Sequence, residues 1–482
     1  MPFQFDNTYL KLDKGLFSII NPTEVNDPNL ALFNTALANQ LGLDITELDE
    51  QTLADYFSGN KLIDGSQPIA QAYAGHQFGH FNKLGDGRAI LLGEHITSDG
   101  NRFDIQLKGS GITPYSRRGD GRATLSSMLR EYVISESMFF LGIPTTRSLA
   151  VVSTGENIYR EGALPGAVLT RIAASHIRVG TFQYVRNFHS KEVLQEFTSY
   201  TIQRHYPELL SAENPALALL KTVMNEQIKL IVNWMRVGFI HGVMNTDNTS
   251  IAGETIDYGP CAFMNVYNPK TVFSSIDQDG RYAFDNQPNI ALWNITRLAE
   301  ALLPLIDNNT DNAIEKAKNI LETFQLQFNE IWLAMMRKKL GITDIQEEDE
   351  LLISSLLDWM HLNKADYTNT FIQLSVPDFS ISEIYTQKTF ITWLTNWKKR
   401  INAGKEIPET ALELMQSCNP VYIPRNHTVE AALKLAQKKG DLTLFNQLLK
   451  ILSKPYDYQD MNHFYQAAPQ QDEECYKTYC GT

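Results

Sequence analysis

The sequence predicts an α+β fold of two lobes, with a β-rich first lobe, a mostly helical second lobe and a cleft between them. Short strand patterns joined by glycine-containing turns dominate residues 61–190. Helical patterns of apolar residues then follow one another over residues 191–456. A chain of 482 residues is also longer than one ordinary hydrophobic core requires.

The first 60 residues are expected to form an N-terminal extension. They begin without a regular pattern, and residues 28–43 (PNLALFNTALANQLGL) then show the apolar spacing of a helix. The clearest strands are residues 88–95 and 103–109, because the connection between them contains an Asp-Gly pair that favours a tight hairpin turn. The sequence therefore predicts a hairpin at the centre of the first lobe.

Beyond this hairpin the patterns predict one more helix and two more strands in the first lobe, at residues 124–141, 145–152 and 167–173. The second lobe is predicted to contain helices at residues 216–239, 290–306, 312–340, 348–362, 388–403 and 428–453. The remaining residues, 457–482, are polar, and we expect them to be a flexible tail.

The composition argues against several classes of function. Hydrophobic residues make up 43% of the chain and charged residues 20%, as in a globular protein. The formal net charge of −13 argues against a nonspecific nucleic-acid binder, because phosphate contacts need clustered cations. No apolar run reaches the roughly 18 residues of a membrane span, and no signal or transit peptide is recognisable. We expect a bacterial-type cytoplasmic protein that engages neither nucleic acid nor membrane.

Residues 240–259 (IHGVMNTDNTSIAGETIDYG) carry the most informative pattern in the chain. Asn248 and Asp257 offer oxygen ligands of the kind that Mg²⁺ or Mn²⁺ prefers. Asp247 lies beside them and is free to act as a base. His241, an Asn seven residues later and an Asp-aromatic-Gly turn occur in the order found in the catalytic loop of kinase-like phosphotransferases.

Two features of this stretch count against a simple interpretation. An isolated Asn-Thr-Asp-Asn-Thr-Ser run would be an ordinary capped turn, since these residues favour turns. Moreover, Val243 stands two residues after His241, where a kinase carries its catalytic Asp. His241 and the Asp-aromatic-Gly turn on either side of this run therefore favour a metal site. A kinase would in addition need an Asp where this chain has Val243.

Lys108 and Glu131 are predicted to form an ion pair. Lys108 lies on the second strand of the hairpin, and Glu131 follows in the next helix, which is where a kinase pairs its strand Lys with a helix Glu. Such a pair holds the ammonium extended toward a phosphate. The alternatives are that Lys108 is exposed to solvent and that Glu131 is an acid on the protein surface.

Glycines and arginines of the first lobe suggest a polyphosphate ligand. Gly85, Gly87 and Arg88 form a short Gly-rich segment whose N–H groups can approach phosphate, although an ordinary turn would have the same composition. Residues 108–190 contain ten cations against five acids, and nine of the ten are Arg, which binds phosphate oxygens with a forked geometry. Arg171 and Arg178 would share one face if their segment were helical.

The remaining histidine and cysteine candidates are weaker. His76 and His80 are four residues apart but interleaved with glycines, so a structural or cleft-wall role is favoured over zinc. Cys475 and Cys480 lie in the tail, and Cys261 follows the DYGP turn. Four Cys in a chain of this length do not indicate a disulfide framework, and a redox role for any of them stays open.

Taken together these motifs resemble the selenoprotein O family, also called the YdiU family. The resemblance covers nearly the whole chain and rests on YAGHQFG (73–79), GDGRA (85–89), QLKGSGITPYSRRGDGRA (106–123), REYVISE (130–136), TRIAASHIRVGTFQ (170–183), HGVMNTDN (241–248), DYGP (257–260), FDNQP and ALWN (284–294) and NP–YIPRNH (419–427). It implies a bilobal protein-kinase-like fold with family-specific extensions. Many members carry selenocysteine third from the C-terminus, where this chain has Cys480.

The resemblance also implies a reaction and a set of roles. ATP would bind in reversed orientation, and AMP would pass to a Ser, Thr or Tyr hydroxyl of a protein with release of pyrophosphate; UMP from UTP is the variant reaction. The matching catalytic positions are Lys108, Glu131 and the base Asp247. The nucleotide positions are Gly85, Gly87, Arg88, Lys108, Asp120, Gly121, Arg171, Arg178 and Asp257, and the metal positions are Asn248 and Asp257. A γ-phosphoryl kinase and an inactive pseudokinase scaffold are the alternative functions.

Overall fold

An antiparallel sheet of nine strands forms the first lobe in the part of the chain that the computed structural model describes, which is residues 3–160, 162–377, 383–404, 406–459, 461–469 and 478. The strand order is β1-β3-β5-β6-β9-β8-β2, with β4 paired to β3 and β7 to β9. The strands are β1 (Phe17–Ile19), β2 (Asn29–Phe33), β3 (Ile69–Gln77), β4 (His80–Gly85), β5 (Ala89–Ile96), β6 (Arg102–Lys108), β7 (Ala123–Thr124), β8 (Arg147–Tyr159) and β9 (Ala163–Ala173).

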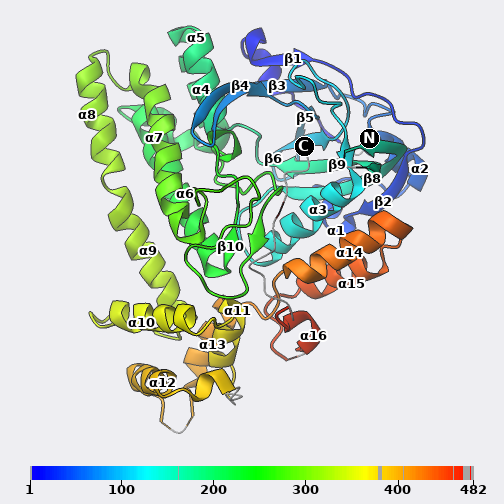
Figure 1. Cartoon of the computed structure of the whole chain (residues 1–482). Helices are drawn as coiled ribbons and strands as arrows, with labels where there is room; N and C mark the ends of the chain where they lie inside the picture. The colour runs from blue at the N-terminus through cyan, green and yellow to red at the C-terminus, as the bar shows by residue number, and fades with distance from the viewer. Residues whose placement is uncertain are drawn as a thin grey trace.

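Helices cover both faces of this sheet (Figure 1). On one face, α1 (Thr35–Gln40) and α2 (Glu50–Ser58) contact β8, and α2 also contacts β2 and β9. Ile105 and Leu107 of β6 belong to the same buried cluster as side chains of these two helices. On the other face lies α3 (Leu125–Phe140), which contacts β8 and β9. Because side chains alternate along a strand, Gln106 and Lys108 point to the α3 face.

The second lobe is helical, which together with the sheet confirms the predicted fold class. Its long central helix is α6 (Pro215–Arg236), against which α7 (Gln287–Ile306) and α9 (Phe324–Lys339) pack. The other elements are α4 (Val179–Phe188), α5 (Lys191–His205), β10 (Phe239–Ile240), β11 (Ala262–Phe263), α8 (Thr310–Leu321), α10 (Asp349–Leu362), α11 (Tyr367–Leu374), α12 (Lys388–Arg400), α13 (Glu409–Cys418), α14 (Asn426–Lys439), α15 (Thr443–Leu452) and α16 (His463–Gln466). None of the described helices is both long and apolar enough to cross a membrane.

Three predicted elements were wrong in their extent. The helix expected over residues 28–43 begins as strand β2, because pairing with β8 overrides the local helical pattern, and the Asn34 side chain then caps α1 by accepting from the Leu37 N–H. The helix expected over 312–340 divides into α8 and α9. The helix expected over 428–453 divides into α14 and α15 at Gly440, whose left-handed backbone (φ 66°) ends α14.

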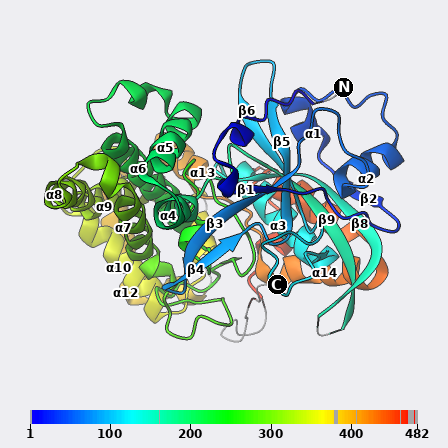
Figure 2. The ribbon, with the colours of Figure 1, turned by 90° about the horizontal axis from the view of Figure 1, so that it is seen from above.

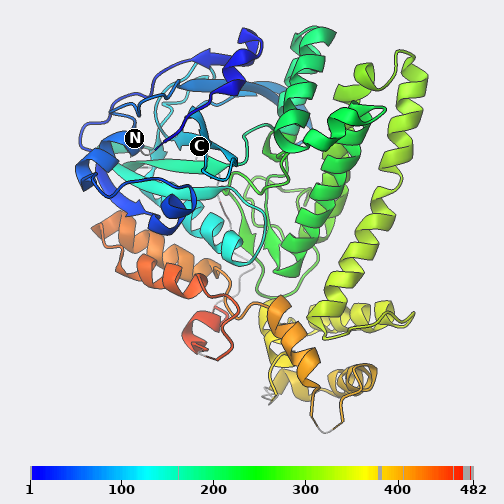
Figure 3. The ribbon, with the colours of Figure 1, turned by 180° about the vertical axis from the view of Figure 1, so that it is seen from behind.

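Two features of the chain path bring distant segments to the cleft. The β3–β4 hairpin reaches from the sheet to α4 of the second lobe (Figure 2), and its His76 packs edge-on to Trp293 of α7. The α14–α15 pair returns from the second lobe and packs against α3 of the first (Figures 1 and 3). The cleft is therefore bordered by both ends of the sequence.

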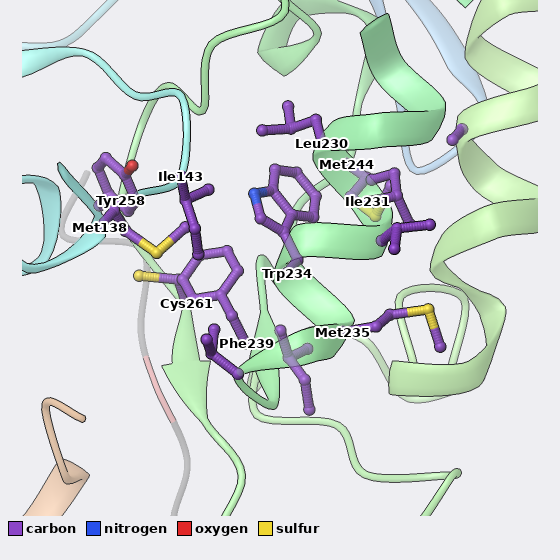
Figure 4. Close-up of a cluster of buried hydrophobic side chains, with 14 of the residues drawn as sticks. Met138, Ile143, Leu230, Ile231, Trp234, Met235, Phe239, Met244, Tyr258 and Cys261 are labelled. Atoms are coloured by element: carbon purple, nitrogen blue, oxygen red, sulfur yellow. The ribbon is translucent and has the colours of Figure 1, made fainter. Parts of the chain in front are cut away.

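A buried apolar cluster supports residues 240–259, here called the central loop, on one side (Figure 4). Trp234 of α6 and Phe239 of β10 pack there with Met138 and Ile143 from the end of α3, and with Cys261 after the DYGP turn. All five side chains are buried. Close packing of this kind resists displacement, so the cluster holds β10, and with it the start of the loop, in one place.

Candidate active site

A single cavity of about 1220 Å³ lies between the two lobes, and every residue that the sequence singled out as catalytic, nucleotide-binding or metal-binding lines it. These residues are Gly85, Gly87, Arg88, Lys108, Asp120, Gly121, Glu131, Arg171, Arg178, Asp247, Asn248 and Asp257. They come from the sheet, from α3 and from the central loop, so the fold gathers positions that are up to 172 residues apart, from residue 85 to residue 257.

Lys108 and Glu131 form the predicted ion pair. The Lys108 Nζ donates to Glu131 Oε2 at 2.5 Å, and the two residues are 6% and 3% exposed. The alternatives of a solvated lysine and a surface acid are therefore wrong. The β6 strand directs Lys108 toward α3, and Glu131 lies on the buried side of that helix.

Arg171 and Arg178 also converge on the site, although not by the helical geometry considered from the sequence. Arg171 lies on β9 opposite Gln106 of β6, and Arg178 is the residue before α4. Arg171 donates to Asp257 Oδ1 at 2.7 Å and Arg178 donates to Asp257 Oδ2 at 2.8 Å. A strand and a helix terminus, not one helix face, bring the two guanidinium groups together.

Asp257 is the centre of this cluster. Its carboxylate accepts from Lys108 Nζ at 2.8 Å in addition to the two arginines. Burial alone would raise the pKa of Asp257, but Lys108, Arg171 and Arg178 outweigh it and hold the pKa well below its usual range. The backbone at Asp257 is left-handed (φ 65°), a conformation that is uncommon for a residue with a Cβ.

His241 fixes the central loop to the segment that carries Asp257. Its Nε2 lies 2.9 Å from the Ile256 carbonyl oxygen, so this nitrogen carries the proton. The ring is buried and stacks on Trp234 with centroids 5.3 Å apart. Nearby, Asn248 donates through Nδ2 to the Val243 carbonyl oxygen at 2.9 Å, which leaves its amide oxygen available as a ligand.

Asp247 is almost enclosed. Its Oδ2 accepts from Gln77 Nε2 at 3.3 Å, and its Oδ1 is buried without a hydrogen-bond partner among the described residues. Burial raises the pKa of Asp247 to about 6. Arg178 donates to the backbone oxygen of Asp247 at 2.7 Å, which ties the loop to the cation cluster. A buried carboxylate oxygen without a partner is a position where a proton or a cation is favoured.

The β3–β4 hairpin covers the outer side of this loop, a contact that no sequence pattern predicts. The His76 N–H donates to Thr246 Oγ1 at 2.7 Å, and the Phe78 N–H donates to Asn245 Oδ1 at 3.1 Å. Glycine is required at position 75, because a Cβ there would lie 2.2 Å from Asp247 Oδ1. The only sequence signal for this role is the unusual pair of glycines in YAGHQFG.

Replacing Gly75 by alanine is expected to displace Asp247 and lower the turnover rate about 100-fold, since misplacing a reacting group by about 1 Å costs that much. The thermal midpoint of unfolding should change little by comparison. Gly162→Ala is the matched control, because a Cβ there meets open space. Activity equal to that of the control would show that Asp247 need not occupy its present position.

Asp86, an acid inside the Gly-rich segment for which the sequence pattern indicates no role, is buried beside the cations. Its carboxylate accepts from the Gln71 N–H at 3.1 Å and lies 3.8 Å from Arg178. Burial raises the pKa of Asp86 to about 6. Arg88 follows at the start of β5, and its carbonyl oxygen accepts from the Gly109 N–H at 2.7 Å, which joins the Gly-rich segment to the end of β6.

Asp120 and Gly121 lie farther out, in the loop before α3. Asp120 forms a two-pronged ion pair with Arg160 at 2.8 and 2.9 Å. That pair lowers the pKa of Asp120 and fixes the loop against the β8–β9 turn. These residues therefore border the outer part of the cavity and not its charged centre.

The donors present suit a hard divalent cation. Asp257 and Asn248 supply a carboxylate and an amide oxygen in the same cavity. In contrast, no group of three His, Cys, Asp or Glu side chains arranged for a metal occurs in the described ranges. His76 instead accepts from Gln183 Nε2 at 2.8 Å through Nδ1 and packs edge-on to Trp293.

The cysteines contribute little to this site. Cys261 is fully buried behind the DYGP turn, and burial raises the pKa of its thiol to about 11, which disfavours a reactive thiolate. Cys475 and Cys480 lie outside the described residues.

A family model described as "Protein adenylyltransferase SelO" matches residues 1–453. A protein nucleotidyltransferase YdiU of Pelagibacter ubique (strain HTCC1062) is 55% identical over 100% of this chain and 99% of its own. Proteins of the same name from Clostridium botulinum (strain Eklund 17B / Type B) and Brevibacillus brevis are 54% and 53% identical, over 99% and 100% of this chain and 97% and 98% of theirs.

Proposed function

Because the chain belongs to the SelO family of protein adenylyltransferases, we propose that it is a protein nucleotidyltransferase that transfers AMP from ATP to a Ser, Thr or Tyr hydroxyl of another protein and releases pyrophosphate. The observation that carries this proposal is the convergence of Lys108, Arg171 and Arg178 beside Asp247 and Asn248 in one cavity. UTP as donor, with UMP transfer, is the variant of the same reaction.

The cation cluster suits the pyrophosphate end of the nucleotide. Lys108, Arg171 and Arg178 come from three different elements and reach one carboxylate, so they can equally surround a chain of phosphates. Glu131 keeps Lys108 extended into the cavity. These cations would stabilise the negative charge that develops on the leaving pyrophosphate.

Asp247 is the proposed base. The acceptor hydroxyl loses its proton to Asp247 Oδ1, its oxygen forms a bond to the α-phosphorus, and the bond from that phosphorus to the bridging oxygen breaks. The electron pair of the broken bond leaves with pyrophosphate. The buried and unpartnered state of Oδ1 supports this role, because nothing among the described residues competes for the incoming proton.

The residues present also fit Mg²⁺ or Mn²⁺, with Asn248 and Asp257 as the proposed ligands. Such an ion supplies charge neutralisation at the phosphates when it is bound. Asp257 now contacts three cations, so it must exchange at least part of these contacts for the ion. We further propose the cytoplasm as the working compartment, which the free thiols of Cys261 and Cys418 support.

Val243 separates this proposal from an ordinary kinase. It is 7% exposed and lines the cavity at the position where a kinase carries its catalytic Asp, so no carboxylate is available there. An inactive pseudokinase scaffold would share this feature. The presence of Asp247 a few residues farther along favours catalysis with a displaced reaction centre.

Labelled nucleotides distinguish these functions. The purified protein and a mixture of acceptor proteins are incubated with ATP labelled at the α- or γ-phosphate, with Mg²⁺ or Mn²⁺, and the products are weighed by intact-mass spectrometry. Covalent α-label together with pyrophosphate release is the expected result. Covalent γ-label would establish a kinase, and nucleotide binding without either adduct would establish a scaffold.

A further inference from the structure

The cavity is larger than a bound nucleotide requires. Small-molecule pockets hold about 300–1,000 Å³, whereas this cavity holds about 1220 Å³. Ten Lys or Arg residues and six Asp or Glu residues line it among the described residues, although the chain as a whole has a net charge of −13. The additional volume and the excess of positive charge both indicate that a second molecule enters the cavity beside the nucleotide.

The inner cations are not the source of this excess. Lys108 and Arg171 each contact Glu131 and Asp257, and Arg178 contacts Asp257. In contrast, Arg117, Lys434 and Lys438 in the outer lining are exposed, and none of them forms an ion pair with another described residue. Their charges are therefore directed to solvent or to whatever enters the cavity.

Two elements present these outer cations. Arg117 lies in the loop between β6 and α3, and Lys434 and Lys438 are four residues apart on α14, so their side chains share one face of that helix. The opposite side of α14 is buried through Val429, Leu433 and Ala436. On the face of the lysines, the ion pair of Glu430 with Arg130 at 2.9 Å also ties the helix to α3. The lysines are held at the cavity by a docked helix and not by a loose loop.

The β3–β4 hairpin covers one side of the central loop. It is held there by hydrogen bonds from His76 to Thr246, from Phe78 to Asn245 and from Gln77 to Asp247. A protein hydroxyl that reaches Asp247 through this cavity enters a space whose lining also includes the outer cations.

From this arrangement we infer that Arg117, Lys434 and Lys438 dock an acidic segment of the acceptor protein, so that preferred acceptor hydroxyls have Asp or Glu residues close to them in sequence. This inference rests on the proposed nucleotidyltransferase function and adds the class of acceptor. Exposed charges of this kind raise the encounter rate of an oppositely charged partner, and salt weakens the effect.

Three peptides with the same acceptor hydroxyl and with flanking Glu, Gln or Lys test the inference. AMP incorporation should be about tenfold more efficient, as kcat/KM, for the Glu peptide than for the Lys peptide at low salt, and the difference should shrink at 0.5 M salt, a concentration that shortens the screening length to roughly 4 Å. Fluorescence anisotropy of the labelled peptides measures binding without relying on transfer. Binding or transfer without any charge preference would overturn the inference.

The double variant Lys434→Glu with Lys438→Glu should reverse the peptide preference and leave the KM for ATP unchanged. Lys439→Glu is the matched control, because this exposed lysine lies on the same helix outside the cavity lining and its variant should behave as wild type. A rise in the KM for ATP with every peptide would assign the lysines to the nucleotide instead. Charge-dependent binding without covalent α-label would contradict the proposed function while leaving the docking surface supported.

Discussion

Replacing Asp247 by asparagine is expected to lower the rate of nucleotide transfer by about 10²–10⁴-fold, which is the usual contribution of a positioned base. The amide has nearly the same shape and can still accept from Gln77 through its oxygen, but it cannot take the acceptor proton. Nucleotide affinity should remain close to that of the wild type, because Lys108, Arg171 and Arg178 are untouched. Single-turnover incorporation of α-label and calorimetric titration with ATP measure the two quantities separately.

Asp99→Asn is a suitable control for this variant, since Asp99 lies in the exposed β5–β6 turn. An Asp247→Asn enzyme that transfers AMP at the wild-type rate would mean that another group takes the proton. A parallel loss of nucleotide affinity would instead mean that Asp247 acts in binding.

Replacing Asp257 by asparagine should abolish transfer and also destabilise the free protein. The carboxylate neutralises three buried cations, and removing one partner of a buried ion pair typically costs about 3–5 kcal/mol. The direction of this pKa shift determines how the stability of the folded protein depends on pH. The pKa of Asp257 is lowered in the folded protein, so its contribution to stability is present above its unfolded pKa and disappears as the pH falls through the folded pKa. Denaturant unfolding at neutral pH measures the loss.

A second substitution separates the two effects of Asp257. Adding Lys108→Met to Asp257→Asn removes one of the unpaired cations, so part of the lost stability should return while transfer stays absent. An Asp257→Asn protein with wild-type stability would show that solvent or Glu131 already neutralises the cluster. Full transfer activity in that variant would rule out Asp257 as a metal ligand.

The sequence was most informative where chemistry depends on local order. Lys108 on a strand and Glu131 in the following helix could be paired because one hairpin and one helix fix their relation. Asp247, Asn248 and Asp257 lie within one short stretch, so their proximity needed no knowledge of the rest of the chain. The strand patterns of residues 61–190 and the helical patterns that follow them likewise predicted the fold class.

The parts that escaped prediction depend on contacts between distant segments. Gly75 and Gln77 meet Asp247 across about 170 residues, and neither carries a pattern of its own that names this partner. Asp86 lies in a segment with the composition of a turn, and the local sequence does not indicate that it is buried beside Arg178. Strand β2 was mistaken for helix because its partner β8 lies more than 100 residues farther along. In β2, strand pairing overrides the local helical propensity. At the other positions, contacts with distant segments determine the surroundings of the side chain.

The return of α14 to the first lobe has a consequence for biosynthesis. The cavity is lined by residues that begin at Tyr73 and include Lys434 and Lys438 of α14, so its wall stays open until more than 430 residues have left the ribosome. Domains can begin to fold during synthesis, and a half-made chain could already assemble the inner cation cluster from the sheet and central loop. Without α14 that chain lacks the charged wall that would retain an acceptor. The order in which the polypeptide emerges therefore places completion of the proposed docking surface near the end of synthesis.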